Sequence, residues 1–101
     1  MLTGKQRAFL RAMANGIDTV IAVGKDGVSP ELTQAVDEAL EARELVKLGV
    51  LSNCANDAKS VAQMLGGRTR SEVVQIIGKK IVLYRRNKKK PRLLTRATIF
   101  I

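Results

Sequence analysis

The order in which helical and strand patterns alternate along this chain is the feature that most limits its fold. Thr3 and Gln6 fit a capping box at the start of one helical pattern, and Ser29-Pro30 is a typical start for the next. A short β-branched run at 19–23 and a run rich in Leu and Val at 44–51 flank this second helical pattern, and both predict strands. Two strands joined by a helix are expected to be parallel, with a right-handed crossover.

The second half of the chain adds one more helix and a hairpin. Residues 53–65 carry helical spacing, which we expect Gly66 and Gly67 to end. Strand patterns at 72–77 and 80–85 are separated by Gly78-Lys79, which suits a type II′ turn. The 101 residues therefore predict a single compact α/β domain in the order α-β-α-β-α-β-β, with helices packed on a four-stranded mixed sheet.

Some local features of the first helix and the first strand can also be predicted. The run 19–23 is expected to be a buried strand, because it is short and almost entirely apolar. Asn15-Gly16 is expected to end the first helix in the left-handed conformation, which both residue types tolerate. The basic side chains of this helix lie off its apolar stripe, so we expect them to face solvent.

The composition changes from Arg86 onward. Residues 87–92 form a basic run that should resist compaction, and residues 93–101 are strand-like in composition. We therefore predict a domain at 1–86 and a basic C-terminal tail at 87–101. The sequence leaves open whether this tail is flexible or adds an edge strand.

The charge of the chain is large and unevenly placed. Eighteen Lys and Arg stand against nine Asp and Glu, a net charge of +9, and residues 61–101 hold eleven of the basic residues and one of the acidic ones. Such a field attracts polyanions by steering and by release of counterions. The charge therefore predicts a nucleic-acid partner. The alternative is a protein that uses its basic tail to bind a membrane surface or DNA.

The residue types that are missing argue against catalysis. The chain has no His, and Cys54 is its single cysteine, so a histidine base, a histidine metal ligand and an intrachain disulfide are excluded. No convergent set of polar residues suggests an active site. We expect a cytoplasmic monomer that is not an enzyme, with no metal, no cofactor, no small-molecule substrate and no membrane span.

A glycine loop between the first strand and the second helix is the first candidate site. Gly24-Lys25-Asp26-Gly27 is a GxxG loop, in which glycines let a sugar-phosphate chain come close and Lys25 supplies charge. The alternative is an ordinary strand-to-helix turn. Asp26 counts slightly against phosphate contact.

Basic side chains in the first helix and around the two C-terminal strands are the second candidate. They would bind phosphate and position the protein without reading sequence, whereas scattered solvated charge is the alternative. The aromatic side chains are Phe9, Tyr84 and Phe100, too few for stacking on a sheet face, although Tyr84 could stack on one base. The candidate basic residues are Lys5, Arg7, Arg11, Arg43, Lys79, Lys80, Arg85 and Arg86.

Four blocks in this order resemble the CRM domain (chloroplast RNA splicing and ribosome maturation) in its bacterial stand-alone, YhbY-like form. The blocks are 2–7, 23–28, 38–47 and 75–85, and the resemblance extends over roughly residues 2–91. It implies a fold similar to the C-terminal domain of bacterial translation initiation factor three. It also implies RNA binding through the glycine loop and through the shared basic positions Lys5, Arg7, Arg43 and Arg85.

The same resemblance implies a cellular role. Bacterial members are associated with the precursor of the large ribosomal subunit. The expected function is therefore an accessory factor in 50S assembly that binds structured 23S rRNA in the pre-50S particle. The alternatives are a permanent ribosomal protein and a general RNA chaperone.

Overall fold

Four strands form one mixed sheet in the computed structural model, which describes residues 2–89, 91 and 93. The elements are α1 (Gly4–Ala14), β1 (Thr19–Val23), α2 (Pro30–Arg43), β2 (Leu45–Val50), α3 (Ala58–Thr69), β3 (Glu72–Ile77) and β4 (Lys80–Tyr84). The strand order is β1-β2-β4-β3, with β1 parallel to β2 and the other neighbours antiparallel. The predicted element order, parallel pair and mixed sheet are confirmed.

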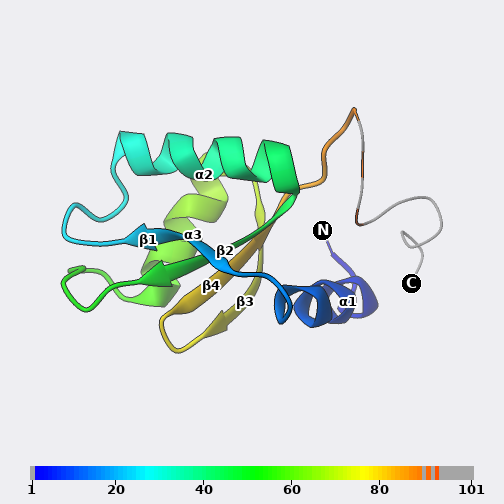
Figure 1. The fold of residues 1–101 in the computed structure, drawn as a ribbon, viewed down its shortest axis with the longest axis horizontal. Coiled ribbons are helices and arrows are strands. Elements are labelled where there is room, and N and C mark those ends of the chain that lie inside the picture. The colour runs from blue at the N-terminus through cyan, green and yellow to red at the C-terminus, as the bar shows by residue number, and fades with distance from the viewer. Residues whose placement is uncertain (1, 90, 92, 94–101) are drawn as a thin grey trace.

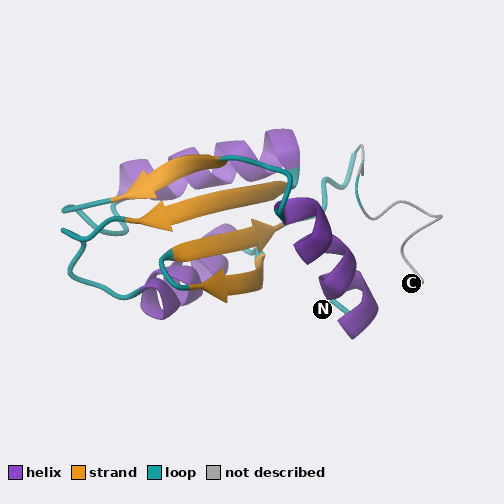
Figure 2. Cartoon of the chain, turned by 60° about the horizontal axis from the view of Figure 1, so that its bottom comes forward, coloured by secondary structure: helices purple, strands orange, loops and turns teal. Residues whose placement is uncertain are grey.

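The helices cover both faces of the sheet unequally. In Figures 1 and 2, α2 and α3 lie on one face and α1 lies on the other, near the end where β1 begins. One core cluster joins the sheet to α2 and α3 and includes Val36, Leu40 and Leu65. A second, smaller cluster joins the opposite face to Leu10 and Ala14 of α1. This arrangement leaves the end of the sheet where β1 and β2 finish uncovered by α1.

The helix starts follow the sequence signals. The amide of Gln6 donates to the Thr3 hydroxyl over 3.1 Å, and the Thr3 amide donates back to the Gln6 side chain over 2.9 Å. At the start of α2, the Ser29 hydroxyl accepts from the Leu32 amide over 3.1 Å. Both predicted N-caps are therefore confirmed, and each satisfies backbone donors that the helix itself leaves unpaired.

The predicted bounds of the third helix, 53–65, are wrong. Asp57 caps α3 by accepting from the Ser60 amide over 2.8 Å, and the helix runs on through Gly66 to Thr69. Gly66 lies within the last turns of α3, where a Cβ would lie 3.4 Å from the Ser71 carbonyl oxygen. The helix ends at Arg70, which takes the left-handed conformation with φ of 56°.

Two expectations for the segment before α2 are also wrong. β1 is an edge strand in which Thr19 and Val20 are exposed and Val23 is fully buried, because it has a neighbour on one side only. Asn15 ends α1 with an ordinary helical φ of −63°. The Asn15 amide donates to the Arg11 carbonyl over 3.3 Å, and the Gly16 amide donates to the Met13 carbonyl over 3.1 Å. This bonding closes the helix without a left-handed residue.

The hairpin between β3 and β4 agrees with its prediction. Ile77 pairs with Lys80, so Gly78 and Lys79 form the turn. Gly78 has φ of 56° and Lys79 has no positive φ, as a type II′ turn requires.

A buried carboxylate ties the segment after β4 to the domain. Glu44, 1% exposed, lies between α2 and β2 and accepts from the Asn87 amide over 2.7 Å and from the Leu93 amide over 3.0 Å. The described part of the predicted tail therefore packs near the junction of α2 and β2. The open choice between a flexible tail and an added edge strand falls on 94–101, outside the described residues.

Candidate nucleic-acid interface

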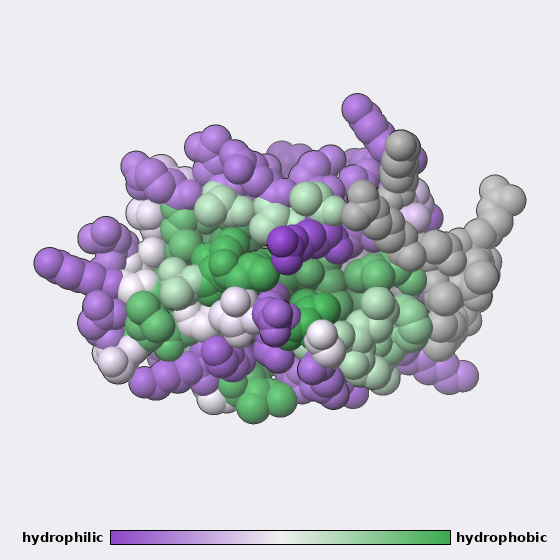
Figure 3. All heavy atoms as spheres, viewed as in Figure 1, coloured by the Kyte–Doolittle hydropathy of each residue, from purple (hydrophilic) through white to green (hydrophobic). Residues whose placement is uncertain are grey.

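Three turns meet at one end of the sheet, which we call the loop end: 24–28, 51–57 and 78–79. Because β1 and β2 are parallel, the loops that follow them leave the sheet at the same end (Figure 1). The Leu51 amide donates to the Val23 carbonyl over 2.8 Å, and the Val50 amide donates to the Lys79 carbonyl over 2.7 Å. These bonds join the three turns into one surface, which is hydrophilic at its outer margin in Figure 3.

The glycine loop is accessible on this surface. The Gly27 amide donates to the Gly24 carbonyl over 3.0 Å and closes the turn, and Gly27 has φ of 61°, where other residues are strained. Lys25 and Asp26 project into solvent. The nearest side chains over the two glycines are neutral: a Cβ on Gly24 would lie 3.5 Å from Asn53, and one on Gly27 would lie 3.5 Å from Asn56. The side chains nearest to the two glycines therefore carry no negative charge that would repel a ribose-phosphate chain.

Further cations lie at the loop end. Lys79 is exposed in the hairpin turn. Lys80, the next residue, is exposed too, and its ammonium donates to the Thr19 hydroxyl over 3.2 Å. Arg68 reaches from α3 to donate to the Val28 carbonyl over 3.0 Å, directly after the glycine loop. The structure thus brings the glycine loop and the hairpin cations to one end of the molecule.

The predicted basic residues of α1 lie at the other end of the molecule from the glycine loop (Figure 1). Lys5 and Arg11 are exposed, as expected. Arg7 is half-buried, and its guanidinium donates to the carbonyls of Val73 and Val74 in β3. The expectation that Arg7 faces solvent is wrong, because this side chain fastens α1 to the edge of the sheet.

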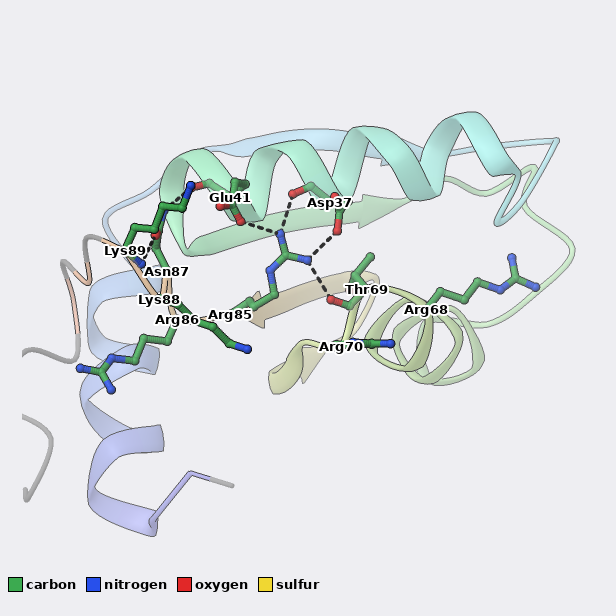
Figure 4. A pocket seen from close by; sticks show the side chains of 10 residues that line it. All are labelled: Asp37, Glu41, Arg68, Thr69, Arg70, Arg85, Arg86, Asn87, Lys88 and Lys89. Atoms are coloured by element: carbon green, nitrogen blue, oxygen red, sulfur yellow. Dashed lines mark hydrogen bonds and ion pairs between the residues drawn. The ribbon is translucent and has the colours of Figure 1, made fainter.

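Arg85 occupies the middle of a groove of about 630 Å³ between α2, α3 and the segment after β4 (Figure 4). Its guanidinium donates to the Thr69 carbonyl over 2.8 Å and to the Asp37 carboxylate over 2.6 Å, with Glu41 at 3.3 Å. These bonds place Arg85 inside the fold, where it links α2 to the end of α3. Arg86, the next residue, is exposed. So is Arg43 at the end of α2.

The aromatic side chains within the described residues are not available for stacking on bases. Tyr84 is 3% exposed, and burial, together with the charge of Glu44, raises the pKa of its phenol to about 12. Phe9 packs against the α1 core cluster. Phe100 lies outside the described residues. Within the described residues, Tyr84 and Phe9 therefore offer no exposed ring face for stacking.

Within the described ranges, two other kinds of feature are absent. No group of three or more His, Cys, Asp or Glu side chains there could hold a metal ion. No helix there is long and apolar enough to cross a membrane.

The family model of the CRS1/YhbY (CRM) domain matches residues 2–85. The chain belongs to this family. The match covers the whole sheet, all three helices and the glycine loop, so the CRM resemblance seen in the four sequence blocks is confirmed.

Relatives of this CRM domain carry names that refer to RNA. The probable RNA-binding protein YqeI of Bacillus subtilis is 49% identical over 88 residues, which are 87% of this chain and 92% of that protein. A probable RNA-binding protein of Methanocaldococcus jannaschii is 36% identical, over 83% of this chain and 63% of the relative.

A solved structure supports the fold. The solution structure of a hypothetical protein of Staphylococcus aureus, described as a candidate RNA-binding protein, is 44% identical, with a TM-score of 0.73. The similarity covers 92% of this chain and 99% of the other. The single α/β domain with a four-stranded mixed sheet is therefore shared with a close relative of known structure.

Asn53 and Asn56 are the residues of this surface that the sequence reasoning missed. They lie in the loop after β2 and carry no charge, so a search for cations passes over them. The predicted parallel pairing of β1 and β2 could have indicated them, because it places the loop that holds Asn53 and Asn56 beside the glycine loop.

Proposed function

We propose that this CRM domain binds RNA at the loop end and holds the sugar-phosphate backbone against the glycine loop. The observation that carries the proposal is the accessible Gly24–Gly27 turn, which has a cation within it and another, Lys79, in the adjoining hairpin. The net charge of +9 and the names of the relatives support the same partner.

The chemistry follows from the parts of this surface. A glycine backbone lets phosphate come within hydrogen-bond reach of main-chain amides, since no Cβ intervenes. Lys25 and Lys79 add charge that releases counterions from the RNA. Each phosphate contact with a single strand contributes about −0.7 to the slope of log affinity against log salt. The exposed cations Lys5, Arg11, Arg43, Lys80 and Arg86 are predicted to act on RNA that extends beyond the loop.

In the cell, the proposed role is that of a cytoplasmic, monomeric accessory factor in 50S assembly, bound to 23S rRNA in the pre-50S particle. The support is the likeness to bacterial stand-alone members of the family. The family model matches residues 2–85, which include every helix and strand of the described fold. Phosphate contacts suit this role, because they hold structured RNA without demanding one sequence.

The RNA-binding proposal is tested by Gly24→Asp, with Gly16→Asp as the matched control. Neither glycine has a positive φ, and a Cβ at either meets only ordinary contacts, at 3.5 Å and 3.7 Å. Affinity for a labelled single-stranded RNA should fall at least tenfold in Gly24→Asp and stay near wild type in Gly16→Asp, with equal melting temperatures. Equal RNA affinity in the two variants would remove the glycine loop from the interface.

The cellular role is tested separately by sucrose-gradient sedimentation of a bacterial lysate. An assembly factor should sediment with precursor particles of the large subunit and be absent from mature 70S ribosomes. A stoichiometric presence in 70S ribosomes would indicate a permanent ribosomal protein, and a spread over all RNA fractions would indicate a general chaperone.

A further inference from the structure

We propose that Asn53 and Asn56 read the bases of the nucleotides that the glycine loop holds, with a preference for adenine in single-stranded RNA. The inference rests on the proposed RNA-binding function of the loop end and adds sequence recognition to it. Its basis is the position of the two amide side chains over the two glycines.

The geometry places one amide beside each glycine. A Cβ on Gly24 would lie 3.5 Å from Oδ1 and 4.0 Å from Nδ2 of Asn53. A Cβ on Gly27 would lie 3.5 Å from Oδ1 of Asn56. A ribose-phosphate chain held against the glycines would therefore have an amide within reach at both ends of the loop.

Both amides are unused by the fold. Asn53 and Asn56 are exposed, and their side chains make no hydrogen bond with any other described residue. An asparagine that serves only to form a turn commonly bonds its own main chain through the side-chain oxygen. The turn at Leu51–Cys54 is instead closed by the main chain, where the Cys54 amide donates to the Leu51 carbonyl over 3.1 Å.

The two lysines and the tyrosine near the loop end do not offer a donor and an acceptor side by side to a base. Lys25 and Lys79 bind phosphate, which is the same at every nucleotide. Tyr84 is buried, so it cannot stack on a base. An amide offers a donor and an acceptor side by side. Adenine presents the matching pair on two edges, at N6 and N7 and at N6 and N1, whereas cytosine and uracil present it on the Watson–Crick edge alone. This complementarity gives the preference for adenine.

The experiment uses the full chain and three labelled probes: octamers of riboadenylate, ribouridylate and ribocytidylate, compared by fluorescence anisotropy at one salt concentration. Wild type should bind the adenylate octamer about tenfold more tightly than the other two, the discrimination typical of one bidentate amide contact. The double variant Asn53→Ala with Asn56→Ala should bind all three octamers with nearly equal affinity, and its salt slope should not change.

Controls separate this inference from the proposed function and from loss of fold. Asn15→Ala removes an exposed asparagine beside α1 and should keep the adenine preference. Asn53→Ser with Asn56→Ser keeps turn-compatible residues and should lose the preference at an unchanged melting temperature. Gly24→Asp should lower the affinity for all three octamers by the same factor.

Two results would overturn the inference and leave the function intact. One is a wild-type chain that binds the three octamers equally while Gly24→Asp still weakens them. The other is a preference for adenine that survives in both double variants. Failure of Gly24→Asp to weaken any octamer would instead refute the proposed function.

Discussion

Replacing Arg85 with alanine tests whether this side chain serves the fold or the RNA. The sequence pattern places Arg85 among the RNA-contacting cations, whereas the structure surrounds its guanidinium with acceptors from α2 and α3. Arg85→Ala removes bonds to the Thr69 carbonyl, the Asp37 carbonyl and carboxylate, and Glu41. The variant should therefore unfold more easily and still bind RNA.

The size of the effect follows from how exposed each partner is. Thr69 is 2% exposed, so the charged hydrogen bond to its carbonyl should contribute about 1.5 kcal/mol. The side chains of Asp37 and Glu41 are 55% and 63% exposed, so solvent reduces each ion pair to about 0.5 kcal/mol. The free energy of unfolding should therefore fall by about 2.5 kcal/mol, which lowers the melting temperature by about 10 °C or more in a domain of this size.

The assay measures both quantities on matched variants. Thermal unfolding followed by circular dichroism gives the melting temperature, and Arg86→Ala is the control, because Arg86 is exposed and has no hydrogen bond or ion pair with the described residues. The control should change stability by about 0.5 kcal/mol or less. RNA affinity is measured at a temperature where every variant is folded, over a range of salt concentrations.

The salt slope decides between the two roles. Arg85→Ala should keep the wild-type slope, whereas Lys25→Ala should lower its magnitude by about 0.7, the loss of one phosphate contact. An Arg85→Ala protein that melts like wild type and shows a reduced slope would refute the structural role.

Three further predictions concern the glycine loop, Tyr84 and Glu44. Gly27→Ala should lower the free energy of unfolding by about 1 kcal/mol, since φ is 61° there, and Gly24→Ala should be near neutral; urea unfolding would measure both. Burial favours the neutral phenol of Tyr84, so this stabilisation is complete below pH 10 and is lost as the pH rises toward 12; absorbance titration of this single tyrosine should show no phenolate near pH 10, and early ionisation would contradict its burial. Glu44→Gln replaces one of the two carboxylate oxygens with an NH2 donor, so either the Asn87 or the Leu93 amide loses its acceptor, and trypsin should cleave after Lys88 faster than in wild type.

Much of the fold could be predicted because its signals are local. The caps at Thr3 and Ser29, the β-branched runs and the Gly78-Lys79 turn each depend on a few neighbouring residues, and each agrees with the structure. Their order then determines the parallel pair, since a helix between two strands leaves few alternatives.

Several of the failures involve contacts that the local sequence does not reveal. Gly66 resembles a helix stop in sequence, yet it lies within α3, where a Cβ would lie 3.4 Å from the Ser71 carbonyl oxygen. Likewise Arg7 resembles a solvent-facing cation until its carbonyl partners in β3, far away in sequence, are known. The glycine loop was predictable from its spacing, whereas the amides of Asn53 and Asn56 became candidates only when their distance from it was known.

The bond between Arg7 and β3 has a consequence for how two copies of this chain can meet. β3 is an outer strand of the sheet, and outer strands tend to recruit a strand from another molecule. A strand from a second copy that pairs with the carbonyls of Val73 and Val74 would have to displace the Arg7 guanidinium from them. This displacement would also loosen the attachment of α1 to the sheet. The side chain that attaches the first helix thus also occupies acceptors that a second copy would need in order to pair with this edge.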